Sequence, residues 1–434
     1  MCYTLIWVAP QKFIIAFVPL REVEGRKLFL LSQNKNKEDN MKTQSFNEIE
    51  NLTKEYSMIP ICKEIYADVI TPIQLLRKME AFDKNFFLLE SVEGGEKWAR
   101  YSFLGYEPVL HITCKNGKVT QKSGEIEHTV TVDPMDALRQ LLHKYKSPKI
   151  EGMPTFTGGF VGYFGYEMIG YAEPKLNIKD SEFDDYNLML FDKVIVYDHL
   201  KQKIMVIANM KSKDGIQGYN TALLEIEKMI ALINDQRKLP VLEADKDVKF
   251  KCNVTKEEYC RMIEKTKHYI KEGDIFQGVI SRRFVADYKS SLINAYRVLR
   301  TTNPSPYMYF IQSDDLQIAG ASPETIVKLV DGKLTTFPVA GTKPRGVNDE
   351  QDKTLEKELL ADEKELAEHN MLVDLARNDM GRIAKYGSVY LEDYMKIHRF
   401  SKVMHIASTV CGQIREDKDG CDTVSALLPA GTLS

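Results

Sequence analysis

The sequence predicts an α+β fold, and three observations support that prediction. Short apolar strands occur in neighbouring pairs joined by tight turns, which is typical of antiparallel hairpins. Segments with the apolar period of a helix separate these pairs. The 434-residue chain is 44% hydrophobic and 28% charged, a balance that excludes disordered and collagen-like chains. Antiparallel pairs interleaved with helices favour α+β over a doubly wound parallel sheet.

In the first part of the chain, Thr71 followed by Pro72 is predicted to begin a helix that continues to residue 82. Residues 86–89 and 100–104 are predicted as paired strands around a Gly-Gly turn. Residues 157–165 combine glycines with aromatics, a strand that another backbone can approach closely. The other elements predicted here are a hairpin over 191–197 and 203–208 and a helix over 218–233.

A polar stretch at residues 237–247 is the predicted domain boundary, which divides the chain into 41–245 and 246–434. Beyond it, Thr255 and Glu258 form a capping box that begins a helix ending at residue 272. A single long helix is predicted over 355–379. The strands predicted in this half are 275–285, 306–312, 316–319, 326–330, 333–337 and 401–412.

Residues 1–40 differ in pattern from the rest of the chain. The apolar run from Met1 to Leu20 is interrupted by proline and polar residues, so it lacks the roughly 20 apolar residues of a membrane-spanning helix. A basic start and a cleavage site, which a signal peptide needs, are also missing. We predict that Met41 is the native start and that residues 1–40 are a non-native or disordered extension. A true N-terminal extension is the alternative.

Charge and cysteine content exclude several functional classes. Lys and Arg total 59 against 62 Asp and Glu, a net charge of −3, which does not suggest nucleic-acid binding. The seven cysteines form no Cys-x-x-Cys pair, which argues against a disulfide framework or structural zinc and favours the cytoplasm. The P-loop, G-x-G-x-x-G, G-x-S-x-G and H-E-x-x-H motifs are absent, so a nucleotide cofactor is not predicted.

Several residues on these elements are candidates for metal binding, catalysis or ligand binding. Glu365 and Glu368 share a face of the predicted long helix and could hold Mg²⁺, although a solvated helix face is the commoner reading. Glu324, after a Ser-Pro turn, could act as a general acid if burial raises its pKa. Residues 337–342, which include Gly341, are predicted to turn from a strand into a glycine loop whose N–H groups could bind a carboxylate, or to form an ordinary turn. His405, in a predicted strand, is more often a core residue than a catalyst.

Taken in order, these segments resemble the anthranilate synthase component I family of chorismate-utilising enzymes. The most specific segments are the run ELAEHNMLVDLARND at 365–379 and the run PVAGT at 338–342. The other matching segments are LLES at 88–91, DIFQ at 274–277, NPSPYM at 303–308, ASPE at 321–324 and VMHIAS at 403–408.

This resemblance implies two orthogonally packed, mostly antiparallel sheets flanked by helices. It implies a tryptophan feedback site in residues 41–245 and an incomplete chorismate-binding catalytic region in residues 246–434. The implied reaction converts chorismate and ammonia to anthranilate and pyruvate, the first step of tryptophan biosynthesis. Ammonia would come from a separate glutamine amidotransferase subunit in a hetero-oligomer, and L-tryptophan would inhibit.

Site residues follow from the resemblance position by position. Glu368 matches the family's Mg²⁺ ligand, and Glu365 is a second candidate that would act through water. Glu324 matches the general acid that protonates the departing C4 hydroxyl, and His405 matches a residue placed against the ring that should matter most in the second half-reaction. The positions matched to substrate binding are Gly341 and Thr342, and those matched to tryptophan binding are Ser91, Pro306, Tyr307 and Met308, with Glu90 and Asn303 nearby.

Gln277 and Ala340 distinguish this chain from the sister enzymes that it resembles. Isochorismate and salicylate synthases carry a lysine base 47 positions before the acid; here 324 − 277 = 47, and glutamine cannot take a proton from water. Aminodeoxychorismate synthases often carry a nucleophilic lysine where Ala340 stands. The pair predicts direct attack of ammonia at C2. Aminodeoxychorismate synthase and a non-catalytic tryptophan-binding fragment are the alternatives.

The chain ends with the sequence GTLS at residues 431–434. In the family that it resembles, this sequence is followed by several dozen more residues, which supply substrate contacts and a second glutamate for Mg²⁺. The resemblance therefore implies a chain truncated at its C-terminal end, which we expect to be inactive or unstable.

Overall fold

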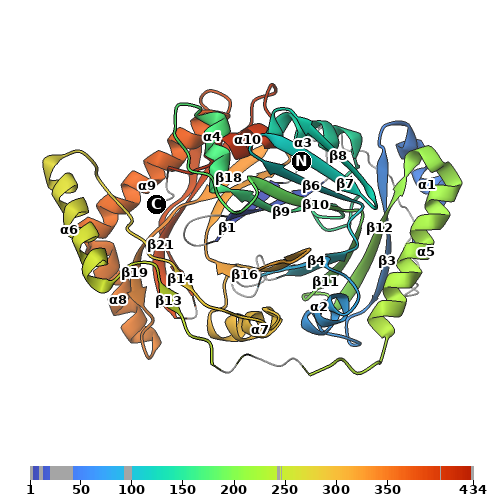
Figure 1. The fold of residues 1–434 in the computed structure, drawn as a ribbon, viewed down its shortest axis with the longest axis horizontal. Helices are drawn as coiled ribbons and strands as arrows, with labels where there is room; N and C mark the ends of the chain where they lie inside the picture. The colour runs from blue at the N-terminus through green and yellow to red at the C-terminus, as the bar shows by residue number, and fades with distance from the viewer. Residues whose placement is uncertain are drawn as a thin grey trace.

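The computed structural model describes residues 3–8, 13–19, 43–91, 100–241, 245, 247–400 and 402–431. These segments form two large β-sheets that face each other, with helices on their outer sides (Figure 1). Every strand pair in the described chain is antiparallel. The prediction of an α+β fold with antiparallel sheets flanked by helices is therefore confirmed. No helix in this described part is long and apolar enough to span a bilayer.

The smaller sheet has seven strands and carries helices α2, α5 and α7 on its outer face. Its strands, in spatial order, are β16 (Leu316–Ser322), β15 (Tyr307–Ser313), β4 (Asn85–Glu90), β5 (Tyr101–Tyr106), β11 (Lys193–Asp198), β12 (Lys203–Lys211) and β3 (Met58–Tyr66). Its helices are α2 (Pro72–Glu80), α5 (Gly215–Asn234) and α7 (Ile293–Thr302).

The larger sheet has twelve described strands. Eleven of them, in spatial order, are β19 (Val339–Pro344), β21 (Val403–Gln413), β18 (Lys333–Phe337), β17 (Thr325–Val330), β1 (Tyr3–Val8), β2 (Phe13–Pro19), β9 (Gly159–Gly165), β10 (Tyr186–Phe191), β6 (Leu110–Lys115), β7 (Lys118–Ser123) and β8 (Ile126–Thr131). The twelfth, β20 (Tyr390–Arg399), pairs with β21.

The helices of the larger sheet include the one that carries part of the candidate site. They are α3 (Pro134–Lys144), α8 (Asp349–Ala361), α9 (Glu363–Gly381) and α10 (Gly420–Leu427). The short helices α1 (Phe46–Ile49) and α4 (Ile169–Ala172) lie elsewhere on the surface. Helix α6 (Lys256–Glu272), with no buried residue, lies at one edge of the molecule, near the small pair β13 (Lys251–Cys252) and β14 (Phe284–Val285) (Figure 1).

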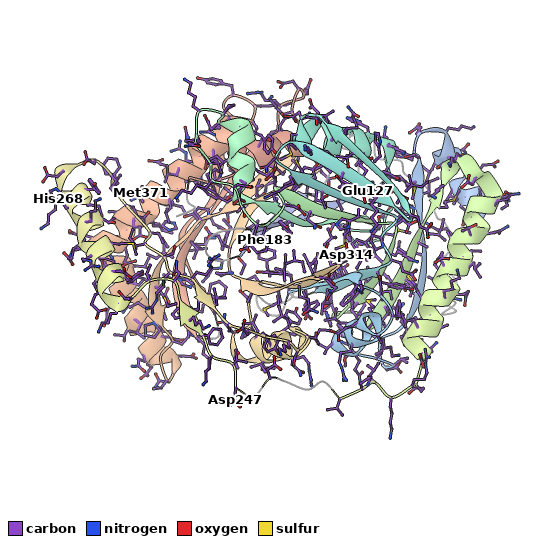
Figure 2. All side chains as sticks on the ribbon, in the orientation of Figure 1. Glu127, Phe183, Asp247, His268, Asp314 and Met371 are labelled. Carbon is purple, nitrogen blue, oxygen red and sulfur yellow. The ribbon has the colours of Figure 1, made fainter. Side chains whose placement is uncertain are left out.

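Side chains from the inner faces of the two sheets fill the space between them (Figure 2). Phe87 and Tyr309 of the smaller sheet share one buried cluster with Tyr163 of the larger sheet. Gly162 allows β9 and β10 to approach, since a Cβ there would lie 2.0 Å from Asn187 O. The close backbone approach predicted for this strand is confirmed. Each sheet takes strands from both sides of residue 245, so the predicted boundary does not separate the sheets, and the domain division stays a prediction.

Strands β1 and β2 lie inside the larger sheet, where β1 pairs with β17 and β2 pairs with β9. Their sequences, YTLIWV and FIIAFVP, are rich in the β-branched and aromatic residues that favour strands. The prediction that residues 1–40 are a non-native or disordered extension stays a prediction beside this placement of residues 3–8 and 13–19. Met41 lies outside the described residues, and the native start stays a prediction.

The predicted single helix over 355–379 is wrong, because two helices meet at Asp362. Asp362 has an extended ψ of 104°, and its Oδ1 accepts hydrogen bonds from Lys364 N and Glu365 N at 3.1 and 3.3 Å. It therefore caps α9. The predicted strand over 275–285 is also wrong except at β14. Within the described part of the chain, this segment has no neighbouring strand before residue 284, and the side chain of Phe276 is 91% exposed.

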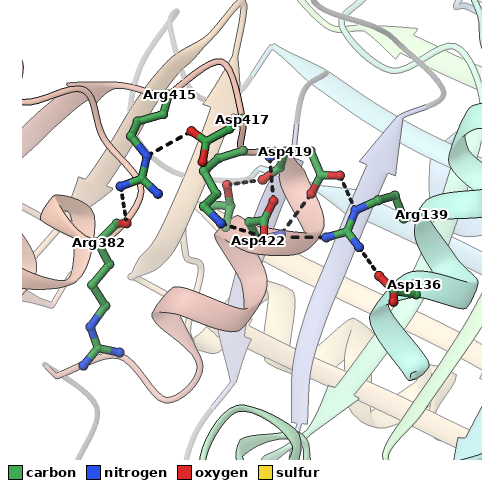
Figure 3. Close-up of polar contacts among 9 residues, drawn as sticks. Asp136, Arg139, Arg382, Arg415, Asp417, Asp419 and Asp422 are labelled. Atoms are coloured by element: carbon green, nitrogen blue, oxygen red, sulfur yellow. Dashed lines mark hydrogen bonds and ion pairs between the residues drawn. The ribbon is translucent and has the colours of Figure 1, made fainter. Parts of the chain in front are cut away.

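An ion-pair cluster joins α3 to the start of α10 (Figure 3). Arg139 Nε donates to Asp419 Oδ2 at 2.6 Å, and Nη2 lies 3.6 Å from Asp422 Oδ1. Asp136, on the same helix as Arg139, also pairs with it. Asp419 caps α10 by accepting from Asp422 N at 3.0 Å. The cluster therefore connects two helices that are far apart in sequence.

Replacing Arg139 with Ala is expected to lower the free energy of unfolding by about 1–2 kcal/mol, because three carboxylates lose their shared cation. Urea denaturation followed by circular dichroism measures the loss. The matched control is Arg377→Ala, which removes an exposed pair with Asp374 on one helix and should cost about 0.5 kcal/mol or less. Equal losses in the two variants would show that the cluster does not join the helices.

Candidate active site

The candidate site is built on the pair of strands β19 and β21 and on helix α9, which packs against both. Thr342 lies opposite His405 in the ladder. An added Cβ on Gly341 would lie 3.3 Å from Glu365 Oε2. The structure thus brings together four of the predicted residues from three separate elements.

His405 is held by the segment that faces it. Its Nδ1 lies 3.1 Å from Gly341 O and 2.9 Å from Thr342 Oγ1. Because a carbonyl oxygen can only accept, these bonds assign the proton to Nδ1 and leave Nε2 without one. Burial lowers the pKa of His405 below its usual value, so the ring is neutral at neutral pH. The geometry therefore supplies a base at Nε2.

Glu324 lies in the turn between β16 and β17. The next residue, Thr325, pairs with Phe337 in the sheet, which places Glu324 beside the start of the segment that contains Gly341. Burial raises the pKa of Glu324 to about 7. This carboxyl group therefore keeps its proton in a large fraction of molecules at neutral pH, as a general acid requires. The described contacts do not join Glu324 directly to His405 or to α9.

The two carboxylates of α9 lie one turn apart. Glu368 Oε1 accepts a hydrogen bond from Gln277 Nε2 at 3.1 Å, although Gln277 is exposed and 91 positions away in sequence. Mg²⁺ in proteins takes one or two carboxylates and completes its shell with water and substrate oxygens. Within the described residues there is no group of three or more His, Cys, Asp or Glu that could hold a metal. Glu365 and Glu368, one turn apart on α9, could supply the one or two carboxylates of such a shell.

His369, which the sequence did not single out as a site residue, fixes α9 to the sheet. His369 is fully buried, and its Nε2 lies 2.7 Å from Ser408 Oγ on β21. Ser408 Oγ also accepts from Met395 N at 2.9 Å, in the bulge of β20. The available signal was a polar residue on the apolar face of the helix, in line with Val373 and Ala376. This contact sets the register that directs Glu365 and Glu368.

Gly341 adopts a φ of +70°, which favours glycine. We expect Gly341→Ala to destabilise the protein by about 1–2 kcal/mol and to reduce activity, because its carbonyl positions His405. The control is Gly387→Ala, which has a φ of +74° but no heavy atom within 4 Å of the added Cβ. Thermal unfolding should show a stability loss in both variants, larger in Gly341→Ala because its added Cβ lies 3.2–3.3 Å from three side chains. Steady-state kinetics should show an activity loss in Gly341→Ala alone. An equal activity in both variants would contradict the positioning role.

The residues predicted for tryptophan binding also lie together, at one end of the smaller sheet. Met308 and Glu90 are neighbours across β15 and β4, and Ser91 follows directly. The Glu90 carboxylate is buried, accepts from Tyr296 Oη at 2.7 Å and forms an ion pair with Arg300. The remaining members of the predicted set are close in sequence to Met308 and comprise Pro306, Tyr307 and the exposed Asn303, which ends α7.

Comparison with known proteins gives a consistent result. A family model described as chorismate binding enzyme matches residues 84–434. The chain is 42% identical over 401 residues to anthranilate synthase component 1 of Acetivibrio thermocellus, with 90% of this chain and 81% of that protein covered. It is 41% identical over 407 residues to the Aquifex aeolicus (strain VF5) protein of the same name, with 90% and 80% covered.

Solved structures show the same relationship. The structure resembles anthranilate synthase component I from Streptococcus pneumoniae TIGR4 with a TM-score of 0.69 at 34% identity, covering 85% of this chain and 80% of that one. The menaquinone-specific isochorismate synthase MenF of Escherichia coli matches with a TM-score of 0.56 at 15% identity, covering 89% and 78%, which shows a shared fold. The chain belongs to the anthranilate synthase component 1 family of chorismate-binding enzymes.

Proposed function

We propose that this chain is the large subunit that converts chorismate and ammonia to anthranilate and pyruvate, the first step of tryptophan biosynthesis. The proposal rests on one observation: the pKa values of two titratable groups of the site are shifted in opposite directions. The pKa of Glu324 is raised to about 7, and that of His405 is lowered. One group can therefore donate a proton and the other can accept one at the same pH.

In the first half-reaction, ammonia adds at C2 of chorismate, both ring double bonds shift and the C4–O bond breaks. The ammonium group formed at C2 then releases a proton to solvent. Glu324 gives its proton to the departing hydroxyl, which leaves as water. Gln277 supports ammonia as the nucleophile, because an amide cannot take a proton from water, whereas ammonia needs no such activation.

In the second half-reaction, the proton on C2 is removed, the bond from C3 to the enolpyruvyl oxygen breaks, and the ring becomes aromatic. His405 Nε2 takes the C2 proton, since Nδ1 is already engaged by Gly341 O. The enolpyruvyl group leaves and becomes pyruvate after it gains a proton. Gly341 and Thr342 present the backbone that faces the substrate.

Glu368 and Glu365 would hold Mg²⁺, which when bound would neutralise a carboxylate of chorismate and orient the ring. Glu368→Gln is expected to weaken Mg²⁺ binding more than about tenfold, as measured by isothermal titration of the protein with MgCl₂. Glu363→Gln, in the exposed first turn of the same helix, is the control and should bind Mg²⁺ like the unaltered protein. Unchanged affinity in Glu368→Gln would remove this residue from the metal site.

The same family membership supports three further parts of the proposal. Ammonia would be delivered by a glutamine amidotransferase subunit, so the working enzyme would be a hetero-oligomer. L-tryptophan would bind near Ser91 and Met308 and inhibit through a coupling between two separate sites. The reaction would take place in the cytoplasm.

Product analysis tests the proposed function. The protein is incubated with chorismate, MgCl₂ and ammonium chloride, and anthranilate is followed by its fluorescence. Anthranilate formation that L-tryptophan suppresses is the expected result. Formation of 4-amino-4-deoxychorismate instead would identify the chain as an aminodeoxychorismate synthase, and isochorismate would show that water is the nucleophile.

A further inference from the structure

A groove on the outer side of the smaller sheet has no role in the proposed reaction. It encloses about 780 Å³ between the first turn of α2 and one side of α7, with the end of β11 as its floor. Figure 1 shows these two helices next to each other on this face of the sheet. None of the residues assigned above to catalysis, metal binding or tryptophan binding lines it.

The charges around the groove leave one cation uncompensated. Arg300 forms its ion pair with the buried Glu90, 2.6 Å away, and Asp198 is paired with Arg100 at 2.8 Å. Burial lowers the pKa of His199, so its ring is neutral. Arg297 Nη1 donates to Asn294 Oδ1 at 3.1 Å, and within the described residues no carboxylate forms an ion pair with Arg297. The groove therefore offers one guanidinium to an anion.

Apolar side chains from α2 and α7 form part of the remaining groove wall, together with polar residues such as Thr71 and Asn294. Ile70, Pro72 and Ile73 form the α2 side, and the side chain of Val298 on α7 is 60% exposed. A fully hydrated ion such as phosphate gains little from such a wall, whereas a ligand with an apolar body buries it. The hydroxyl of Thr301 also lines the groove, where it donates to Val298 O at 2.8 Å, so Arg297 remains the donor that can meet the carboxylate.

We propose that this groove is a binding site for a small monocarboxylate with an apolar, ring-sized body, whose carboxylate pairs with Arg297 and whose body packs against Val298 and the first turn of α2. One negative charge matches the guanidinium of Arg297, which forms no ion pair with another described residue. Because Arg300 lines the groove and also holds Glu90, a bound ligand contacts the residue that fixes the end of β4. The site is separate from the proposed active site and does not depend on the proposed reaction.

Isothermal titration of the full chain with sodium benzoate tests the site. Binding is expected with a Kd on the order of 1 mM, and Arg297→Gln should weaken it about tenfold. The control is Arg261→Gln, an exposed arginine on α6 at the far edge of the molecule (Figure 1), which should not change the affinity. Absence of benzoate binding, or equal affinity in the Arg297→Gln variant, would overturn the proposal.

A second pair of variants keeps the test independent of folding defects. Val298→Glu introduces a negative charge at an exposed position of the wall and should abolish benzoate binding. Val298→Gln introduces a side chain of the same size as Glu but without its charge, and should retain most of the binding. Inorganic phosphate and benzyl alcohol are titrated as separate probes. If phosphate binds as tightly as benzoate, the site recognises only the negative charge. If benzyl alcohol binds as tightly as benzoate, the site recognises only the apolar ring. Either result contradicts the proposal.

Discussion

Replacing Glu324 with Gln is expected to lower kcat by about 10²–10⁴-fold, because the leaving hydroxyl then departs without a proton. An amide has nearly the same shape but no acidic proton, so the loss reports chemistry and not packing. Initial rates of anthranilate formation at a fixed concentration of free ammonia measure it. The control is Glu127→Gln on strand β8 (Figure 2), an exposed carboxylate of the other end of the larger sheet, which should leave kcat unchanged.

The pH dependence of kcat tests the role of Glu324 independently. A general acid works in its protonated form, so kcat at fixed free ammonia should fall as the pH rises through about 7, the raised pKa of Glu324. The raised pKa also means that the folded state binds more protons than the unfolded state between about 4.5 and 7. The contribution of Glu324 to the free energy of unfolding is therefore lost as the pH rises through that window. Glu324→Gln should remove this pH dependence. A rate that is flat across neutral pH would contradict the acid role.

Replacing His405 with Ala is expected to separate the two half-reactions. Chorismate consumption should fall by less than about tenfold, whereas anthranilate formation should fall by about 10²–10⁴-fold, since the base for the C2 proton is absent. An aminated intermediate that still carries the enolpyruvyl group should accumulate. Liquid chromatography with mass detection follows all three species.

The matched control for this variant is His268→Ala, on α6 at the outer edge of the molecule (Figure 2). Its rates of chorismate loss and anthranilate formation should both equal those of the unaltered protein. If both rates fall together in His405→Ala, with no intermediate detected, then His405 serves binding or folding and another group removes the proton.

Local rules predict the hairpins of this fold well. The predicted strands 326–330 and 333–337 appear as β17 and β18, and the two residues between them, Asp331 and Gly332, both have positive φ values, 52° and 77°. This is the turn that the twist of paired strands requires. The helix predicted after Thr71 is α2, with the side chain of Thr71 accepting from Gln74 N. In both cases the decisive interaction joins residues only a few positions apart.

Long-range context explains what the sequence could not reveal. The period of apolar residues runs through Asp362 without a visible break, and only the folded backbone shows that Asp362 caps a new helix. Strand β20 was missed because its bulge, with Met395 at a φ of 51°, disrupts the alternation that identifies strands. The segment 275–285 is apolar like a strand but has a pairing partner only at its end.

In the candidate site, too, the sequence indicated which residues take part but not how they contact one another. The resemblance identified Glu324, Glu368 and His405 by position, but the free Nε2 of His405 depends on a backbone carbonyl 64 positions away. The hydrogen bond from Gln277 to Glu368 likewise depends on the position of the segment that follows α6. Contacts of this kind follow from tertiary packing, which a single sequence does not specify.

The central claim is that this site adds ammonia at C2 and then eliminates pyruvate. Its most direct test is to supply chorismate, MgCl₂ and ¹⁵N-labelled ammonium chloride and to analyse the products by mass spectrometry. The expected products are anthranilate carrying one ¹⁵N atom and an equal amount of pyruvate. Chorismate converted to a hydroxylated product without ¹⁵N, or to a product with ¹⁵N at C4, would contradict it.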